Sequence, residues 1–264
     1  MTRAQALRRA LAALAFIVTF TPASATPFAR PARSAASPVT IVLVHGALID
    51  GSSWRGVYDV LTRDSYQVRI VQQPLTGLDD DVAATRRVLD QVAGPVVLVG
   101  HSYGGSVITV AGDDAKVKAL VYVAALQPDI GETSAEAAPP KPSASQDFRV
   151  AKDGFIFLDP AKFAANFGAD LPKAQAAFMA NSQMPIAAAA FNVKLTAAAW
   201  HDKPSYAVIG TQDQALNPEV AKRMAKRAGS HVTLVRASHA VHVTQPRAVA
   251  SVIEAAAHAV SQAQ

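Results

Sequence analysis

The stretch PVVLVGHSYGG, residues 95–105, decides the fold of this chain. Its first half is a β-branched apolar run typical of a fully buried strand, and residues 106–111 can form about two helical turns. A G-x-S-x-G sequence between a strand and a helix is typical of a nucleophile elbow, a sharp turn that exposes a serine hydroxyl. Gly100 and Gly104 leave room where the two backbones nearly touch. We therefore predict Ser102 as a nucleophile; the alternative is a glycine-rich turn with a capping serine.

A nucleophilic serine needs a base and an acid that orients the base, and candidates for both follow strand-like segments. Residues 205–210, SYAVIG, are followed by Thr-Gln and then Asp213. Residues 231–236, HVTLVR, are followed by Ala-Ser and then His239. Residues just past the carboxyl ends of parallel strands lie at one edge of the sheet, where such sheets build their sites. We predict Asp213 as the acid and His239 as the base.

Two other residues compete for these roles. Asp129 follows the strand-like segment 120–124 and is a second candidate for the acid. His242 lies three residues beyond His239 and is a second candidate for the base. Asp213 could instead cap a turn or helix. Three further histidines are expected at the surface: His201, His231 and His258.

The negative oxygen that forms during attack on a carbonyl needs two backbone N–H donors. One donor should be the residue after the nucleophile, Tyr103, and the other a residue in the loop after an earlier strand. Residues 39–44, VTIVLV, form such a strand, and His-Gly-Ala follows it. The glycine lets the chain turn back, so we predict the N–H groups of Ala47 and Tyr103 as the oxyanion hole, against the alternative of an ordinary strand-ending turn.

Five segments carry a resemblance to a known family: LVHGA at 43–47, GSSW at 51–54, the elbow, GTQD at 210–213 and ASH at 237–239. With these motifs the chain resembles the α/β-hydrolase superfamily. Within it the chain is similar to the small serine esterase branch, which includes plant methyl esterases, hydroxynitrile lyases and bacterial exported α/β-hydrolases. The resemblance implies an α/β fold: about six mostly parallel strands, helices on both faces and a lid inserted before the strand that leads to Asp213.

The resemblance implies a serine hydrolase without a cofactor that cleaves carboxylic esters through an acyl-enzyme. The lyase members carry a lysine directly after the catalytic histidine, and Ala240 at this position argues against cyanohydrin cleavage. Relatives that open epoxides or remove halides use an aspartate nucleophile, which Ser102 replaces. Two alternatives stay open: cofactor-free perhydrolase or haloperoxidase-type activity on the same residues, and a non-catalytic ligand-binding protein of this fold.

Residues from about 128 to 203 interrupt the alternation of strands and helices and are expected to form the lid. Short helices are predicted at 159–167, 172–179 and 185–193. Five apolar side chains of this segment could line a substrate pocket or pack the lid onto the body: Phe163, Phe167, Phe178, Met179 and Phe191. Their apolar character indicates a small to medium, uncharged, moderately hydrophobic ester as the small-molecule partner.

Helices are also expected at 54–64, 79–92 and 245–260, and a strand at 66–71. The second of these helices opens on three aspartates, Asp79, Asp80 and Asp81. Acidic residues are favourable at the positive end of a helix, so we interpret the triplet as helix capping rather than as a metal site.

The first 25 residues predict export. Arg3, Arg8 and Arg9 precede the apolar run 11–20, and Ala23-Ser24-Ala25 fits a cleavage site. We expect a signal peptide at 1–25, a flexible leader at 26–38 and a hydrolase domain at 39–264. The mature enzyme would then work in the periplasm or outside the cell without a membrane span; an uncut N-terminal anchor is the alternative.

Composition excludes several other classes of protein. The chain of 264 residues has no cysteine, which excludes disulfides and thiolate metal sites. Its formal net charge is +5, without a basic stripe interleaved with aromatic residues, so nucleic acid is not an expected partner. Oligomeric state cannot be read from these features.

Overall fold

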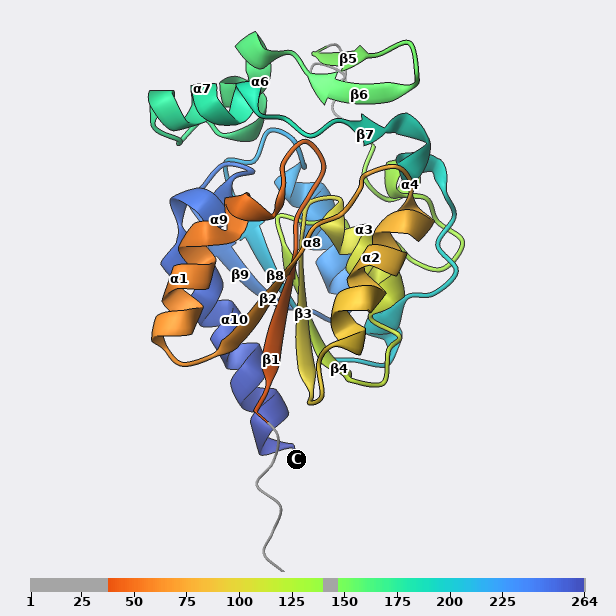
Figure 1. Ribbon diagram of the computed structural model, residues 1–264, viewed down its shortest axis with the longest axis vertical. Helices are drawn as coiled ribbons and strands as arrows, with labels where there is room; N and C mark the ends of the chain where they lie inside the picture. Colours follow the sequence, from red (N-terminus) through yellow and green to blue (C-terminus); the bar gives the residue numbers. More distant parts are fainter. Residues whose placement is uncertain (1–37, 140–146, 264) are drawn as a thin grey trace, which may run out of the picture. The chain divides into compact units, whose positions relative to one another are not determined.

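Six parallel strands form the central sheet of the computed structural model, which describes residues 38–139 and 147–263 (Figure 1). The strands are β1 (Thr40–Val44), β2 (Gln67–Val71), β3 (Val96–His101), β4 (Val117–Val123), β8 (Ser205–Gly210) and β9 (His231–Val235). Their order across the sheet is β2-β1-β3-β4-β8-β9. In register, Val44 lies beside Gly100 and Gly100 beside Tyr122, so the carboxyl ends of the central strands lie level.

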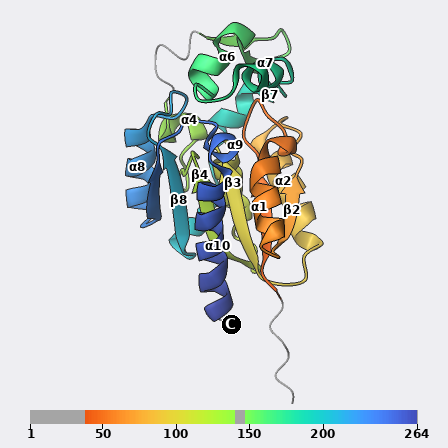
Figure 2. The ribbon, with the colours of Figure 1, turned by 90° about the vertical axis from the view of Figure 1, so that its left-hand side faces the viewer.

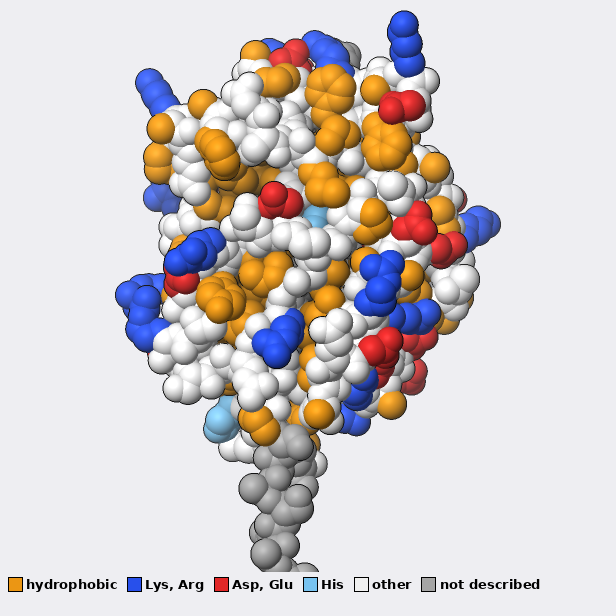
Figure 3. Space-filling model, in the orientation of Figure 1, with side chains coloured by type: hydrophobic (Ala, Val, Ile, Leu, Met, Phe, Trp, Pro, Cys, Tyr) orange, Lys and Arg blue, Asp and Glu red, His pale blue; other side chains and the backbone are white. Residues whose placement is uncertain are grey.

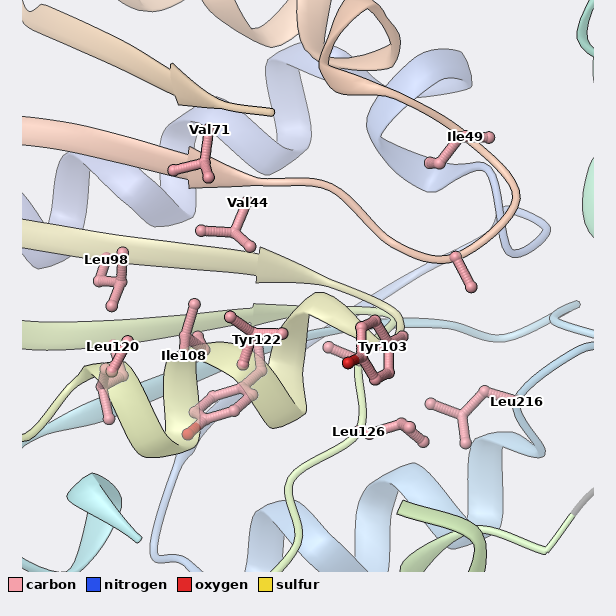
Figure 4. Packing of buried hydrophobic residues seen from close by; sticks show 14 of the residues in the cluster. Val44, Ile49, Val71, Leu98, Tyr103, Ile108, Leu120, Tyr122, Leu126 and Leu216 are labelled. Carbon is pink, nitrogen blue, oxygen red and sulfur yellow. The ribbon is translucent and has the colours of Figure 1, made fainter. Parts of the chain in front are cut away.

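Both faces of the sheet are apolar because successive side chains of a strand point to opposite sides. On one face Val42, Leu98 and Leu120 pack under α2 (Leu78–Asp90), α3 (Gly104–Ala111) and α8 (Pro218–Arg227). Figure 4 shows part of this packing, with Ile108 of α3 against the strands. Each such fully buried side chain contributes about 2 kcal/mol to the free energy of unfolding.

The opposite face is covered by α1 (Arg55–Arg63) and α10 (Pro246–Gln262), which pack against each other and on Leu43, Val99 and Val121 (Figure 2). Two short helices, η1 (Gly51–Trp54) and α9 (Val241–Thr244), lie beside them. The predicted α/β architecture, with helices on both faces of a parallel sheet, is confirmed. Observed strand ends agree with the expected ones to within three residues.

The segment between β4 and β8 lies across the carboxyl ends of the strands (Figure 1). It contains α4 (Ser134–Ala137), α6 (Pro160–Phe167), α7 (Lys173–Asn181), η2 (Ala188–Asn192) and η3 (Ala199–His201). It also contains a small antiparallel sheet of β5 (Phe148–Val150), β6 (Phe155–Leu158) and β7 (Ile186–Ala187). We refer to residues 147–201 as the lid.

One expectation for the lid is corrected, and one element of the lid was not predicted. The helix predicted at 185–193 is instead the strand β7 followed by one 3₁₀ turn, and the β5–β6 hairpin had no counterpart in the sequence analysis. Ile186 pairs with Ile156 across the small sheet, so its conformation depends on a residue about 30 positions away. Local sequence signals are weak for strands of two to four residues, and pairing decides them.

The predicted signal peptide, 1–25, and all but the last residue of the leader, 26–38, lie outside the described residues. Among the residues that the structure describes, no helix combines the length and the apolar character needed to cross a bilayer.

Candidate active site

Ser102 stands at the tip of a sharp turn between β3 and α3. Its φ is +52°, in the left-handed region that a residue with a side chain rarely adopts. Hydrogen bonds hold this conformation: the Ser102 N–H donates to the Val123 carbonyl at 3.3 Å. The Ser102 carbonyl accepts from the N–H groups of Gly105 at 2.9 Å and Leu126 at 3.0 Å. The surrounding backbone therefore fixes the strained residue and exposes its hydroxyl.

The two glycines of the motif allow the backbones to approach as the sequence predicts. A Cβ atom on Gly100 would lie 2.5 Å from the Gly104 carbonyl oxygen, and one on Gly104 would lie 2.5 Å from the His45 carbonyl oxygen. Both distances are far inside van der Waals contact. Any side chain at either position would push the elbow away from β1 or β3.

A chain of hydrogen bonds joins Ser102, His239 and Asp213. The Ser102 Oγ lies 2.8 Å from His239 Nε2, and His239 Nδ1 lies 2.7 Å from Asp213 Oδ2. The carboxylate can only accept at this site, so Nδ1 carries the proton and Nε2 is free to accept the serine proton. Asp213 and His239 are buried, with 2% and 3% of their surface exposed.

The remaining oxygen of Asp213 is also occupied. Oδ1 accepts hydrogen bonds from the N–H groups of Ala215 and Leu216, both at 2.8 Å. These donors stabilise the negative charge in a buried place and leave Oδ2 for the histidine. The capping role considered for Asp213 and a role toward His239 are thus both present, one for each oxygen.

The two competing residues lie elsewhere. Asp129 is paired with His201 Nε2 at 2.7 Å on the surface, and this pair does not contact Ser102. His242 is fully buried, and neither of its ring nitrogens has a hydrogen-bond partner within the described part of the chain. Its ring packs on His101 with centroids 4.0 Å apart, and burial lowers the pKa of His242 to about 3. His242 is therefore a neutral core residue at ordinary pH.

The backbone N–H groups of Ala47 and Tyr103 form no hydrogen bond within the described residues. Ala47, Ser102 and His239 line the same cavity, and Tyr103 directly follows Ser102. The Ala47 loop is fixed by His45, whose Nδ1–H donates to the Gly46 carbonyl at 2.9 Å while Nε2 accepts from Gln73 N–H at 3.0 Å. Two unused donors on rigid loops can stabilise a developing oxyanion.

Tyr103 is anchored from behind by Asp81, a contact that sequence reasoning missed. The Tyr103 hydroxyl donates to Asp81 Oδ2 at 2.9 Å, and the Leu75 N–H donates to Asp81 Oδ1 at 2.8 Å. Asp81 has no exposed surface, and burial raises its pKa to about 6. All three aspartates lie in the first turn of α2, as the sequence predicts, and the side chain of the third, Asp81, also turns inward to Tyr103.

His101 forms a second contact that the sequence did not reveal. Its Nε2–H donates to the backbone carbonyl of His239 at 3.0 Å, which joins the elbow to the loop that carries His239. Burial and the neighbouring His242 and His239 lower the pKa of His101 well below its usual value. A neutral ring with its proton on Nε2 suits this hydrogen bond.

A cavity of about 280 Å³ opens at Ser102 between the sheet and the lid. Its polar lining residues are Ser102, His239, Ser134 and Asn166. The remainder of the lining is apolar: Ala47, Leu48, Leu126, Ala135, Ala138, Phe148, Ile156, Leu158, Phe167, Ile186, Phe191, Ala215 and Leu216. Figure 3 shows that hydrophobic side chains also gather on the outer surface of the lid. Within the described part of the chain, no Lys, Arg, Asp or Glu lines the cavity.

The five apolar lid residues named from the sequence divide between different places. Phe167 and Phe191 line the cavity. Phe163, in α6 of the lid itself, is fully buried, and Phe178 is 69% exposed. Met179 lines a separate groove beside η1. The apolar character of these residues identified an apolar segment but not which face of each short helix meets the cavity.

No group of three or more metal-ligating side chains occurs in the described ranges, and the absence of a cofactor stays a prediction. The arrangement at Ser102 combines a hydroxyl, a base that can take its proton, a buried carboxylate and two unused N–H donors. These are the groups that acyl transfer through a covalent serine intermediate requires.

Comparison with known proteins agrees with the geometry. A family model described as the alpha/beta hydrolase family matches residues 41–252. An alpha/beta hydrolase named nvfD from Aspergillus novofumigatus is 28% identical over 244 residues, which cover 82% of this chain and 96% of that protein.

Solved structures are similar at lower identity. A pyrethroid hydrolase from Sphingobium faniae superposes with a TM-score of 0.70 at 21% identity, covering 85% of this chain and 99% of the other. An extracellular alpha/beta-hydrolase from a Paenibacillus species, described as sharing structural and functional homology with tobacco salicylic acid binding protein 2, has a TM-score of 0.72 at 20% identity over 83% and 99% of the two chains. These two likenesses show a shared fold.

Proposed function

The chain belongs to the alpha/beta hydrolase family, and we propose that it is a serine hydrolase that cleaves carboxylic esters through an acyl-enzyme. One observation carries the proposal: Ser102 Oγ, His239 and Asp213 are joined by hydrogen bonds of 2.8 and 2.7 Å at the floor of an apolar cavity. The proposed roles are nucleophile for Ser102, general base and acid for His239, and orienting acid for Asp213.

In the first half of the reaction, His239 Nε2 takes the proton of Ser102 as Oγ attacks the ester carbonyl carbon. The carbonyl oxygen becomes negative and accepts hydrogen bonds from the N–H groups of Ala47 and Tyr103. Asp213 stabilises the imidazolium that forms. The bond to the leaving oxygen then breaks, His239 returns its proton to that oxygen, and the alcohol departs from the acyl-enzyme.

In the second half, a water molecule replaces the alcohol. His239 takes one water proton as the oxygen attacks the acyl carbon, and the same two N–H groups stabilise the new oxyanion. Breakage of the bond to Ser102 Oγ releases the carboxylic acid and returns the proton to the serine. Perhydrolysis would follow the same course with hydrogen peroxide in place of water.

The substrate we propose is an uncharged, moderately hydrophobic ester of small to medium size. The cavity of about 280 Å³ lies just below the usual range for small-molecule sites, roughly 300–1,000 Å³. A charged group in such an apolar lining would lose its hydration without gaining a partner. All three similar proteins are named hydrolases, which supports the same class of reaction.

We further propose that residues 1–25 direct export and are removed, so that the enzyme works in the periplasm or outside the cell. The support is the sequence of residues 1–25, in which positively charged residues are followed by an apolar run and then by small residues. The similar Paenibacillus protein is described as extracellular. N-terminal sequencing of the protein from its host should give a chain that starts at or near Thr26. Recovery of intact chain from soluble cytosol would contradict export and leave the proposed reaction untouched.

Two measurements on the purified protein test the reaction. A fluorophosphonate probe should label the chain at Ser102, and p-nitrophenyl esters of short and medium acyl chains should be hydrolysed. An ester with a carboxylate on its acyl chain should react far more slowly than its uncharged counterpart. A folded protein that takes no label and hydrolyses no ester would instead support the non-catalytic, ligand-binding alternative.

A further inference from the structure

The lid contacts the backbone on both sides of His239. The N–H of Ala240, the residue after the histidine, donates to the carbonyl of Phe167 at the end of α6, at 3.0 Å. The N–H of Ser238, the residue before it, donates to Asp170 Oδ2 at 3.2 Å. Phe167 and Asp170 are three positions apart in the lid. Thus a single short lid segment holds the loop of the proposed base.

Asp170 supplies most of this connection. Besides the Ser238 N–H, its carboxylate accepts hydrogen bonds from the Ser238 hydroxyl and, at 3.0 Å, from the Thr244 hydroxyl. Partial burial raises the pKa of Asp170, but the hydrogen bonds from Ser238 and Thr244 together lower it below its usual value. The group is therefore a carboxylate at neutral pH, and charge-assisted hydrogen bonds of this kind are the stronger ones.

The sheet side of the same loop has its own contact. His101 donates to the His239 carbonyl, so the three successive residues 238–240 are each bound through a backbone atom. The elbow holds the middle residue, and the lid holds the two outer ones. The imidazole can keep its 2.8 Å distance to Ser102 Oγ only while this backbone stays in place.

We propose that Asp170 is a positioning residue, which holds His239 over Ser102 through Ser238, so that the base is correctly placed only while the lid is seated. The inference rests on the proposed function, since it assigns the base role to His239. Loss of the carboxylate leaves the loop held by His101, by Asp213 and by the Phe167 carbonyl, which accepts from the Ala240 N–H and, at 3.3 Å, from the Ser238 hydroxyl. A small displacement of a reacting group, of about 1 Å, is enough to lower a rate by about 100-fold.

A purely structural role for Asp170 would have a different consequence. If the carboxylate only fastens the lid, its loss loosens the walls of the cavity and weakens substrate binding. If it positions the base, its loss lowers the chemical step and leaves binding of a small ester nearly unchanged. Separate measurement of kcat and KM on p-nitrophenyl acetate, which needs little of the cavity, distinguishes the two.

The experiment compares Asp170→Ala, Asp170→Asn and Ser238→Ala with Asp159→Ala as a matched control. Asp159 is also a lid carboxylate, but it binds Ala161 N–H and Arg149, both within the lid. We expect Asp170→Ala to lower kcat by about 10- to 100-fold with less than about a twofold change in KM. Asp170→Asn should lose less, because an amide oxygen can still accept from Ser238. The control should stay within about twofold of wild type.

A double variant tests whether the effect passes through Ser238. If it does, Asp170→Ala combined with Ser238→Ala should lower kcat little more than the more damaging single variant does. If the fold-losses in kcat of the two single variants multiply in the double variant, Asp170 does not act through Ser238. A raised KM with unchanged kcat in Asp170→Ala, or loss of the same size in Asp159→Ala, would overturn the proposal. Should Asp170→Ala fail to fold, Asp170→Asn and Ser238→Ala carry the same comparison.

A measurement without substrate separates this inference from the proposed reaction. The proton between His239 Nδ1 and Asp213 should give a downfield NMR signal in wild type and in Asp159→Ala. In Asp170→Ala the signal should shift or broaden, since the ring is no longer held; an unchanged signal would contradict positioning. A wild-type protein that shows the signal and hydrolyses no ester would contradict the proposed function while leaving the positioning result standing.

Discussion

The loops at the carboxyl ends of β3, β8 and β9 and the lid above them form one cavity, but they are held in different ways. Each loop follows a strand of the parallel sheet, buried for β3 and β8 and exposed for the edge strand β9, and is fixed by hydrogen bonds to neighbouring backbone, as at Ser102 and Asp213. The lid consists of short helices and strands of two to nine residues that pack by their apolar sides. We infer that the sheet edge provides the reacting groups, whereas the lid shapes the substrate site and, through Asp170, holds the loop of His239.

The same contrast appears between two aspartates that both follow strands. Asp213 lies after β8, buried against His239, whereas Asp129 lies after β4 on the surface with His201. Position after a strand brings a residue to the correct edge of the sheet, and packing then decides which side chain enters the cavity. Substitutions of the reacting groups at the sheet edge should therefore abolish turnover. Substitutions of apolar lid residues that line the cavity should change selectivity, whereas Asp170, the lid residue proposed to position His239, should affect kcat.

The largest effect is expected for Ser102→Ala. Loss of the nucleophile should lower kcat on every ester by at least about 1,000-fold, because the three residues act as a unit. Ser106→Ala is the control: Ser106 is a buried serine of α3 whose hydroxyl is bound to Ser134 Oγ at 2.7 Å. It should remain within about tenfold of wild type. If Ser102→Ala kept more than a tenth of wild-type kcat, Ser102 would not be the nucleophile and the reacting groups would not lie at this edge of the sheet.

His239→Ala should be about as damaging as Ser102→Ala, roughly 1,000-fold in kcat. His242→Ala should cost far less in kcat, although removal of a buried ring should lower the free energy of unfolding by about 2–4 kcal/mol. Kinetics well below the melting temperature, together with thermal unfolding, separate the two effects. If His242→Ala lost far more kcat than His239→Ala, the base would be His242.

Asp213→Asn should lower kcat by about 100- to 10,000-fold, since the amide can no longer stabilise the imidazolium. Asp129→Asn should stay within about twofold, because its pairing with His201 is exposed to solvent. Both variants remove one charge after a strand, so they differ only in where the packing puts that charge. Equal losses would mean that burial against His239 is irrelevant to the acid.

The pH dependence of stability offers a test of the elbow's support. Burial raises the pKa of Asp81 to about 6 in the folded protein, above its value in the unfolded chain. Between about pH 4 and 6 the folded state holds a proton that the unfolded state has lost, so the free energy of unfolding falls as pH rises, by about 2–3 kcal/mol in total. Denaturation of wild type and Asp81→Asn at pH 4 and 7 should show a smaller fall in the variant. Parallel profiles would mean that Asp81 is ionised at both pH values.

The smallest effect is expected for an apolar lid residue that lines the cavity. Phe191→Ala enlarges the cavity and should shift the ratio of kcat/KM between medium and short acyl chains by about tenfold, with little change in kcat on p-nitrophenyl acetate. Phe178→Ala is the matched control, because that ring is 69% exposed on α7. A large fall in kcat on p-nitrophenyl acetate for Phe191→Ala would mean that this ring affects the chemical step and does not only shape the cavity.

Sequence alone determined the sheet, the elbow and the residues at its edge. Buried parallel strands are long, apolar and β-branched, and the glycines around Ser102 are required by close backbone contact, so both leave strong local patterns. The strands before Asp213 and His239 could also be predicted, although only β8 is buried and β9 is an exposed edge strand.

Only the tertiary structure decided which competing residues meet and how the lid is built. The choice between Asp213 and Asp129, or between His239 and His242, depends on packing between elements about 100 residues apart in the chain. Local sequence gives no sign of the partners of Asp81, His101 and Asp170. Their contacts to Tyr103, His239 and Ser238 exist only once the chain is folded. The β5–β6–β7 sheet likewise could not be predicted from the sequence, because strands this short are stabilised by pairing with their partners rather than by their own residues.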